Sequence, residues 1–113
     1  MNSKKLAQSI AKIADDKKAK DIVVLDLKNL SAFTDYFVIC SGSSDRQVKT
    51  IAGAIEGELK KKDVRPRGME GYATGHWVLV DYGDVVAHVF YDDERHYYQL
   101  EKLWADAPQL KIA

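Results

Sequence analysis

Residues 75–90 read GHWVLVDYGDVVAHVF, and this stretch decides how the chain folds. Two alternating apolar runs flank the tetrapeptide Asp81-Tyr-Gly-Asp84, a pattern typical of two β-strands joined by a tight turn. We expect Tyr82-Gly83 to form a two-residue loop, which would place Trp77 opposite His88 across the hairpin. The two strands then bring aromatic, aliphatic and titratable side chains together in one small ladder.

The two faces of this hairpin carry different chemistry, because successive side chains of a strand point to opposite faces. One face is uniformly aliphatic, as a packed core is: Val78, Val80, Val85, Ala87 and Val89. The other face mixes aromatic, charged and titratable side chains: Trp77, Leu79, Asp81, Val86, His88 and Phe90. Such a mixture is typical of a docking surface, although packing beneath a helix would also explain it. The sequence favours docking and leaves packing open.

The length and composition are those of one globular domain over residues 1–113. Hydrophobic residues make up 46% of the chain and charged residues 30%, fractions that are ordinary for a soluble globular protein. The single cysteine, Cys40, excludes an internal disulfide and fits a reducing compartment. The amino-terminal segment lacks the apolar stretch of a secretory signal, and no run of about 18 apolar residues occurs. We therefore expect a cytoplasmic protein.

The formal net charge of zero conceals an asymmetry along the chain. Residues 1–67 hold 14 Lys and Arg against 9 Asp and Glu, a net of +5, whereas residues 68–113 hold 3 against 8, a net of −5. The acidic part contains the hairpin, so it disfavours nucleic acid as a partner of that part and favours a basic protein. Two solvated faces of opposite sign are the plainer explanation.

Three helices are predicted from apolar residues at helical spacing: residues 3–18, 44–62 and 94–106. Ser3 and the turn Ser41-Gly-Ser-Ser44 offer N-caps, because a serine hydroxyl can accept a hydrogen bond from a free amide of the first helical turn. The last helix is expected to stop near Pro108 and to turn four side chains inward: Tyr97, Leu100, Leu103 and Trp104.

The order α-β-β-α-β-β-β-α predicts an α/β protein of the α+β kind, with a single mixed five-stranded sheet and helices packed on it. Strands are expected over residues 22–27 and 35–40, over part of the extended piece 65–71, and in the two arms of the hairpin. The strand–helix–strand unit between Asp35 and Glu70 should cross right-handed and bring its two strands parallel. The hairpin should then add an antiparallel margin to the sheet.

The turn Ser41-Gly-Ser-Ser-Asp45 lies between a strand and a helix, where a phosphate could rest on the helix amides. A nucleotide-binding or nucleotidyltransferase enzyme that uses Gly42-Ser43 is therefore an alternative to a docking protein. Such enzymes need paired carboxylates on a strand to hold Mg²⁺, and here Asp26 and Asp81 each stand alone. A helix cap in a tight turn explains the segment adequately without a bound nucleotide, and we favour it. A plain oligomerisation module is a third, weaker alternative.

The remaining candidates for chemistry are three histidines and one cysteine. No Cys partner and no His-x-x-x-His spacing accompanies His76, His88 or His96, so we expect no metal site. His88 fits a packed strand residue better than a base, and Cys40 fits a core residue without an activating cation. We expect no catalytic residue and no cofactor.

Four blocks of the chain carry a family resemblance: DYFVICSGSSDRQV at 35–48, Glu70-Gly71, WVLVDYGDVVAH at 77–88 and RHYYQLEKLW at 95–104. These blocks and their spacing resemble the ribosomal silencing factor family, called RsfS or Iojap, over nearly the whole chain. The resemblance implies a nucleotidyltransferase-like topology that has lost its catalytic carboxylates, in agreement with the missing acid pair.

Family members bind the large ribosomal subunit through its fourteenth protein, a basic protein near the face that meets the small subunit. The resemblance therefore implies a repressor that blocks subunit joining and slows translation when nutrients are short, without enzyme activity. Its partner-binding residues on this chain would be Glu70, Trp77, Leu79, Asp81, His88, Phe90, Arg95 and Tyr98. We hypothesise that a free copy pairs hairpin to hairpin as a homodimer. Ribosomal RNA could be touched by Lys60, Lys61, Lys62, Arg65 and Arg67.

Overall fold

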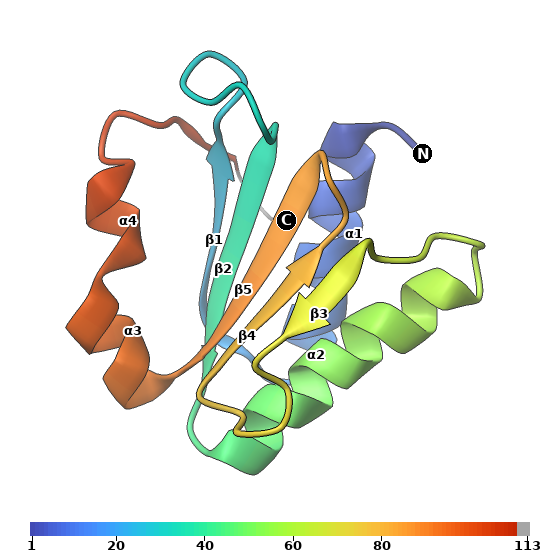
Figure 1. The fold of residues 1–113 in the computed structure, drawn as a ribbon, viewed down its shortest axis with the longest axis vertical. Coiled ribbons are helices and arrows are strands. Elements are labelled where there is room, and N and C mark those ends of the chain that lie inside the picture. The colour runs from blue at the N-terminus through green and yellow to red at the C-terminus, as the bar shows by residue number, and fades with distance from the viewer. Residues whose placement is uncertain (111–113) are drawn as a thin grey trace.

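The computed structural model describes residues 1–110 and shows a single sheet with helices on both faces (Figure 1). The helices are α1 (Ser3–Asp16), α2 (Asp45–Lys60), α3 (Asp92–Tyr98) and α4 (Leu100–Leu103). The strands are β1 (Lys20–Asp26), β2 (Tyr36–Gly42), β3 (Gly68–Glu70), β4 (Trp77–Asp81), β5 (Val85–Tyr91) and β6 (Gln109–Leu110). The predicted mixed α/β class is confirmed, with six strands in place of the five that were expected.

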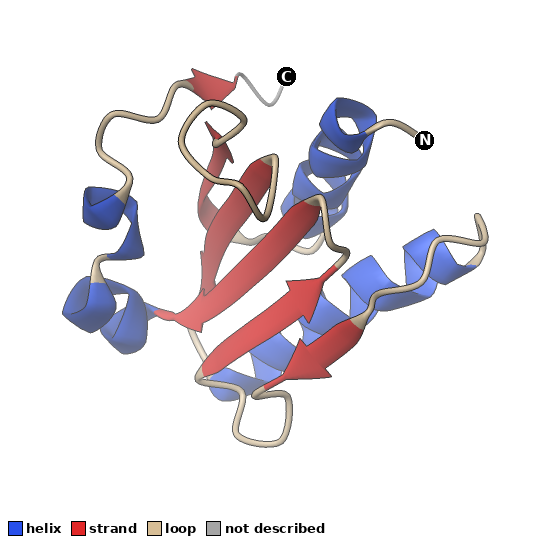
Figure 2. Cartoon of the chain, turned by 45° about the horizontal axis from the view of Figure 1, so that its top comes forward, coloured by secondary structure: helices blue, strands red, loops and turns tan. Residues whose placement is uncertain are grey.

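The strands lie in the order β3-β4-β5-β2-β1-β6, and within residues 1–110 only β2 and β5 pair in parallel (Figure 2). The prediction that the hairpin forms a margin was wrong, because β4 and β5 stand between β3 and β2. The two strands of the predicted crossover, β2 and β3, do run in the same direction, but they are not neighbours. Strands β2 and β5 are buried along most of their length, and strands covered on both faces belong in the middle of a sheet.

The hairpin turn lies one residue later than expected. The Tyr82 amide donates to the Val85 carbonyl at 2.9 Å, so the loop consists of Gly83 and Asp84. Gly83 adopts a φ of +84°, which glycine reaches without a steric penalty. Trp77 therefore pairs with Phe90 and not with His88. The register moves by two residues in total, so every side chain stays on the face that alternation predicted.

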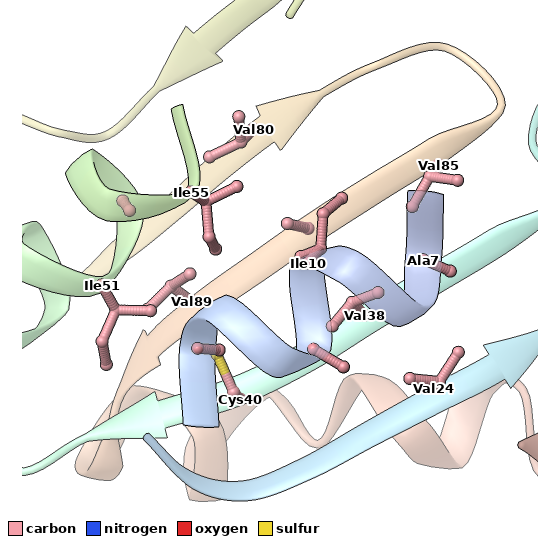
Figure 3. Close-up of a cluster of buried hydrophobic side chains, with 14 of the residues drawn as sticks. Ala7, Ile10, Val24, Val38, Cys40, Ile51, Ile55, Val80, Val85 and Val89 are labelled. Carbon is pink, nitrogen blue, oxygen red and sulfur yellow. The ribbon is translucent and has the colours of Figure 1, made fainter. Parts of the chain in front are cut away.

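The main core lies between the sheet and the pair α1 and α2, which pack side by side on one face (Figure 3). Figure 3 shows Ile10 of α1 and Ile55 of α2 above the valines of the sheet, and both isoleucines are fully buried. The Ser44 side chain caps α2 by accepting from the Gln47 amide, as predicted for that turn. The cap of α1 is Asn2 and not Ser3, since the Asn2 side chain accepts from the Lys5 amide.

The predicted last helix is two short helices, because Gln99 between them adopts a left-handed φ of +47°. They cover part of the opposite face of the sheet, where Leu100 and Trp104 pack as expected against a second buried cluster. The inward placement of Tyr97 and Leu103 was wrong, because both side chains are exposed. The second cluster contains Leu25, Leu27, Ile39, Phe90 and Ala107.

Candidate functional site

The hairpin side chains on the face away from α1 and α2 form what we call the mixed face: Trp77, Leu79, Asp81, Val86, His88 and Phe90. The aliphatic set predicted for the other face is fully built into the main core. On the mixed face, α3 and α4 cover Phe90, whereas Leu79, Asp81 and Val86 remain half-buried. The sheet surface over β4 and the adjoining part of β5 is therefore only partly covered by the chain itself.

Trp77 is half-buried and held in one orientation by three neighbours. Its ring stacks on Phe90 with centroids 4.7 Å apart and lies 4.8 Å from the ring of Tyr98. Its indole Nε1 donates a hydrogen bond to Nδ1 of His88 at 3.1 Å. Tyr98 is 50% exposed, so the aromatic group reaches solvent. The sequence left packing and docking open for Trp77, and both apply: the indole packs against Phe90 and Tyr98, and part of it remains accessible to a partner.

His88 lies beneath the surface, with only 4% of its area exposed. Burial removes water from the ring and lowers its pKa to about 4, so the imidazole is neutral at neutral pH. Because Nδ1 accepts the indole hydrogen bond, the proton of the neutral ring must be on Nε2. That Nε2 is buried and has no hydrogen-bond partner within the described residues. The edge of Phe37 contacts the ring, with centroids 4.5 Å apart.

Carboxylates border the mixed face at its tip and along its edge. Asp81 is half-buried, and its Oδ1 accepts from the Gly83 amide at 2.7 Å, which braces the turn. Asp84 is exposed in the loop itself. Glu70 is exposed on the edge strand β3, where it pairs with Leu79. These acids give the accessible part of the surface a negative border.

The sequence did not reveal a hollow of about 460 Å³ beside the hairpin tip. It is lined by Ser31, Phe33, Thr34, Phe37, Arg67, Asp81, Gly83, Val86 and Trp104. Phe33 at its edge is 91% exposed, an unusual position for a phenylalanine. An aromatic residue in an otherwise polar connection was the only signal in the sequence, and that signal alone does not distinguish an exposed ring from a buried one.

Arg95 lies away from this surface and is buried. Its Nη1 donates to the Ser41 hydroxyl at 2.9 Å, and its Nε and Nη2 both donate to Glu101 Oε2, at 3.2 and 3.1 Å. Arg95 thus fastens α3 and α4 to the end of β2. Of the eight predicted residues, the structure brings together Trp77, Leu79, Asp81, His88, Phe90 and Tyr98, with Glu70 beside them.

The turn before α2 offers little to a phosphate. The Ser43 amide donates to Gln47 Oε1 at 2.7 Å, and the Gln47 amide donates to Ser44 Oγ at 3.0 Å. The Arg46 amide also donates to Asp45 Oδ1 at 2.8 Å, so side chains of the turn and the first helical turn already occupy three amides that a phosphate would need: those of Ser43, Arg46 and Gln47. Burial also raises the pKa of the Cys40 thiol to about 12, which keeps it protonated.

Residues 1–110 offer neither a metal site nor a membrane-spanning helix. Over this range, no three His, Cys, Asp or Glu side chains are grouped so that they could hold a metal ion. The helices in the same range are too short or too polar to cross a membrane.

Comparisons with known proteins agree with the geometry. A family model described as "Ribosomal silencing factor during starvation" matches residues 1–113. A ribosomal silencing factor of Bacillus subtilis is 50% identical over 108 residues, 96% of this chain and 92% of its own length. The chloroplastic Iojap protein of Arabidopsis thaliana is 34% identical over 113 residues, which span 94% of this chain and 44% of that protein.

Solved structures extend the similarity to the fold. A crystal structure from Chromobacterium violaceum superposes with a TM-score of 0.90 at 38% identity and covers 93% of this chain and 88% of its own. Another from Bacillus halodurans gives a TM-score of 0.85 at 42% identity, with 96% and 98% covered. The chain belongs to the ribosomal silencing factor family, as the resemblance of its sequence blocks had indicated.

Proposed function

We propose that this protein is a translational repressor that binds the large ribosomal subunit and prevents the small subunit from joining it. The observation that carries the proposal is the mixed face: an oriented, half-buried tryptophan on a partly uncovered sheet with acids at its border. Aromatic side chains held rigidly near the centre of a surface supply most of the energy of an interface of modest size. Family membership supports the choice of a ribosomal partner.

The partner on the subunit is its fourteenth protein, which is basic. Asp81, Asp84 and Glu70 attract a basic surface and fix its register, while Trp77 and Leu79 supply the apolar contact. Tyr98 extends the contact from α3. The buried residues of the predicted set act from beneath: His88 and Phe90 hold the indole in place.

Repression on this account needs no enzyme activity, because the volume of the domain is sufficient. The molecule measures 34 × 33 × 26 Å along its principal axes. A body of that size at the joining face of the large subunit occupies the space in which the two subunits meet. Acting in the cytoplasm, the protein would use this block to slow translation when nutrients are limited.

Off the ribosome, the same face would be open to a second copy. Two mixed faces placed against each other would cover both tryptophans in a homodimer. Binding to the ribosome would then compete with dimerisation for one surface. This competition predicts that dilution, which favours the monomer, increases the fraction able to bind a subunit.

The test replaces Trp77 with alanine and measures binding to purified large subunits by co-sedimentation. Trp77→Ala removes the central aromatic contact, and a hot-spot loss of about 2 kcal/mol corresponds to roughly thirtyfold weaker binding. Tyr72→Ala is the matched control, because Tyr72 is an aromatic residue with 44% exposure that lies against α2. Circular dichroism confirms that each variant is folded.

A second variant keeps the proposal falsifiable if Trp77→Ala fails to fold. Leu79→Lys places a cation in the half-buried centre of the surface, facing a basic partner, and should weaken binding at least as strongly. The repressor proposal fails if either variant folds and sediments with large subunits as well as the parent protein does.

A further inference from the structure

Five exposed basic side chains gather where α2 ends and the chain returns to β3: Lys60, Lys61, Lys62, Arg65 and Arg67. We call this group the basic corner. It projects beyond the β3 edge of the sheet, at the end of α2 and in the loop that follows (Figure 1). Only two acids, Glu58 and Asp63, lie within residues 58–67, so this segment carries a net charge of +3.

The ion pairs within the corner neutralise little of this charge. Lys61 contacts Glu58 at 3.3 Å and Arg65 contacts Asp63 at 3.7 Å, and all four side chains are largely exposed. Exposed pairs of this kind contribute well under 1 kcal/mol, so they are easily exchanged for another anion. The other three cations of the corner make no ion pair with any residue in the described part of the chain: Lys60, Lys62 and Arg67.

The basic corner adjoins the mixed face through Arg67. The Arg67 amide donates to the Asp81 carbonyl at 2.6 Å, and the Arg67 side chain helps to line the hollow beside the hairpin tip. The corner also leads directly into β3, which pairs with β4. A partner that covers the mixed face therefore has Arg67 at its border, with the rest of the basic corner following along the chain toward the end of α2.

The two regions carry opposite charge and cannot rest on the same kind of surface. Acids at the border of the mixed face would repel a phosphate backbone, and the basic corner would repel a basic protein. On a ribosomal subunit, basic proteins are surrounded by RNA, so a molecule seated on such a protein also meets phosphates. Because the two regions carry opposite charge, only one orientation places the mixed face on the basic protein and the basic corner on the neighbouring RNA.

We propose that the basic corner contacts the phosphate backbone of ribosomal RNA next to the ribosomal protein that the mixed face binds. This inference rests on the proposed function and adds a second partner to it. Lysines on flexible stems and without a shaped pocket neutralise phosphates without reading the sequence of bases. The contact adds affinity that depends on salt, and it orients the repressor on the subunit.

The size of the effect follows from counterion release. Each neutralised phosphate steepens the slope of log affinity against log salt by about 0.7 to 0.9. Replacing Lys60 and Lys62 by glutamine removes two such contacts. From 50 to 200 mM KCl, the affinity advantage of the parent protein over this double variant should therefore shrink roughly tenfold.

The experiment measures the dissociation constant for purified large subunits at 50, 100 and 200 mM KCl and constant Mg²⁺. It compares the parent protein, Lys60→Gln/Lys62→Gln, and a control, Lys12→Gln/Lys17→Gln. The control removes the same charge from exposed lysines of α1 and its C-cap, outside the basic corner. A parallel series uses the isolated fourteenth protein, which carries no RNA.

We expect the affinity advantage of the parent over the corner variant to be about ten times larger at 50 mM KCl than at 200 mM. The control should stay within twofold of the parent, and all three proteins should bind the isolated ribosomal protein alike. An unchanged slope, an equal loss in the control, or an equal loss on the isolated protein would each overturn the inference. A parent protein that binds neither subunits nor the isolated protein would instead overturn the proposed function.

Discussion

Replacing His88 with leucine tests how the mixed face is built, because the structure predicts little change in stability at pH 7 but weaker binding to the large subunit. His88→Leu removes the acceptor of the Trp77 indole hydrogen bond. It also removes the Nε2 proton, a buried donor without a partner, whose burial costs about 1–3 kcal/mol. The indole is half-buried, so water can reach its freed N–H at smaller cost. We expect the stability at pH 7 to change by less than about 1 kcal/mol.

The affinity for the large subunit should nevertheless fall. Without its hydrogen bond the indole can rotate, and fixing one such side chain again on binding costs about 0.5–1.5 kcal/mol. Large-subunit affinity should therefore fall by roughly twofold to tenfold. His88→Asn is the matched variant, since the amide oxygen can occupy the place of Nδ1, and it should recover affinity. Urea unfolding and co-sedimentation give the two readings.

The same substitution should change how stability depends on pH. The pKa of His88 is about 4 in the folded protein against an ordinary value of 6.5, so only the unfolded chain binds this proton between those values. The contribution of neutral His88 to the free energy of unfolding is therefore fully present above pH 6.5, and roughly 3 kcal/mol of it is lost as the pH decreases to 4. His88→Leu should remove this component. Parallel pH profiles for variant and parent, or a stability loss above about 3 kcal/mol at pH 7, would refute the reasoning.

Three further substitutions or reactions test other parts of the structure. Gly83→Ala should destabilise the fold by about 1–2 kcal/mol in urea unfolding, because alanine is strained at a φ of +84°. Arg95→Ala should lower stability by about 2 kcal/mol, since it leaves Glu101 without its cation, and adding Glu101→Gln should recover part of the loss. Cys40 is buried with a raised pKa, so a thiol reagent should label it only as fast as the protein opens.

Local patterns in the sequence predicted most of the elements and the two faces of the hairpin. Alternation assigned Val78 and Val80 to the core and Trp77 and Leu79 to the opposite face, and the structure agrees. That assignment survived the error in register, because a shift by two residues preserves the parity of every side chain. The turn itself was misplaced, because glycine at residue 83 permits a positive φ in more than one loop frame.

Contacts between distant segments explain what the sequence could not reveal. The parallel pairing of β2 with β5 joins strands about 50 residues apart in sequence, and no local pattern records it. The two-residue strand β6 is too short to show a period. Arg95 was predicted as a partner-binding residue, but it is buried with Ser41 and Glu101 as its hydrogen-bond partners. A charged residue becomes internal when the fold supplies its partners, which a sequence does not display.

Site-specific crosslinking is the most direct test of whether the mixed face binds the large subunit. A photoreactive phenylalanine analogue replaces Tyr98, which is 50% exposed beside Trp77, or Tyr72, which is 44% exposed against α2. Both proteins are irradiated on large subunits, and the crosslinked ribosomal protein is identified by mass spectrometry. The account predicts a crosslink from position 98 to the fourteenth protein and none from position 72. A bound complex in which position 72 crosslinks to that protein and position 98 does not would contradict it.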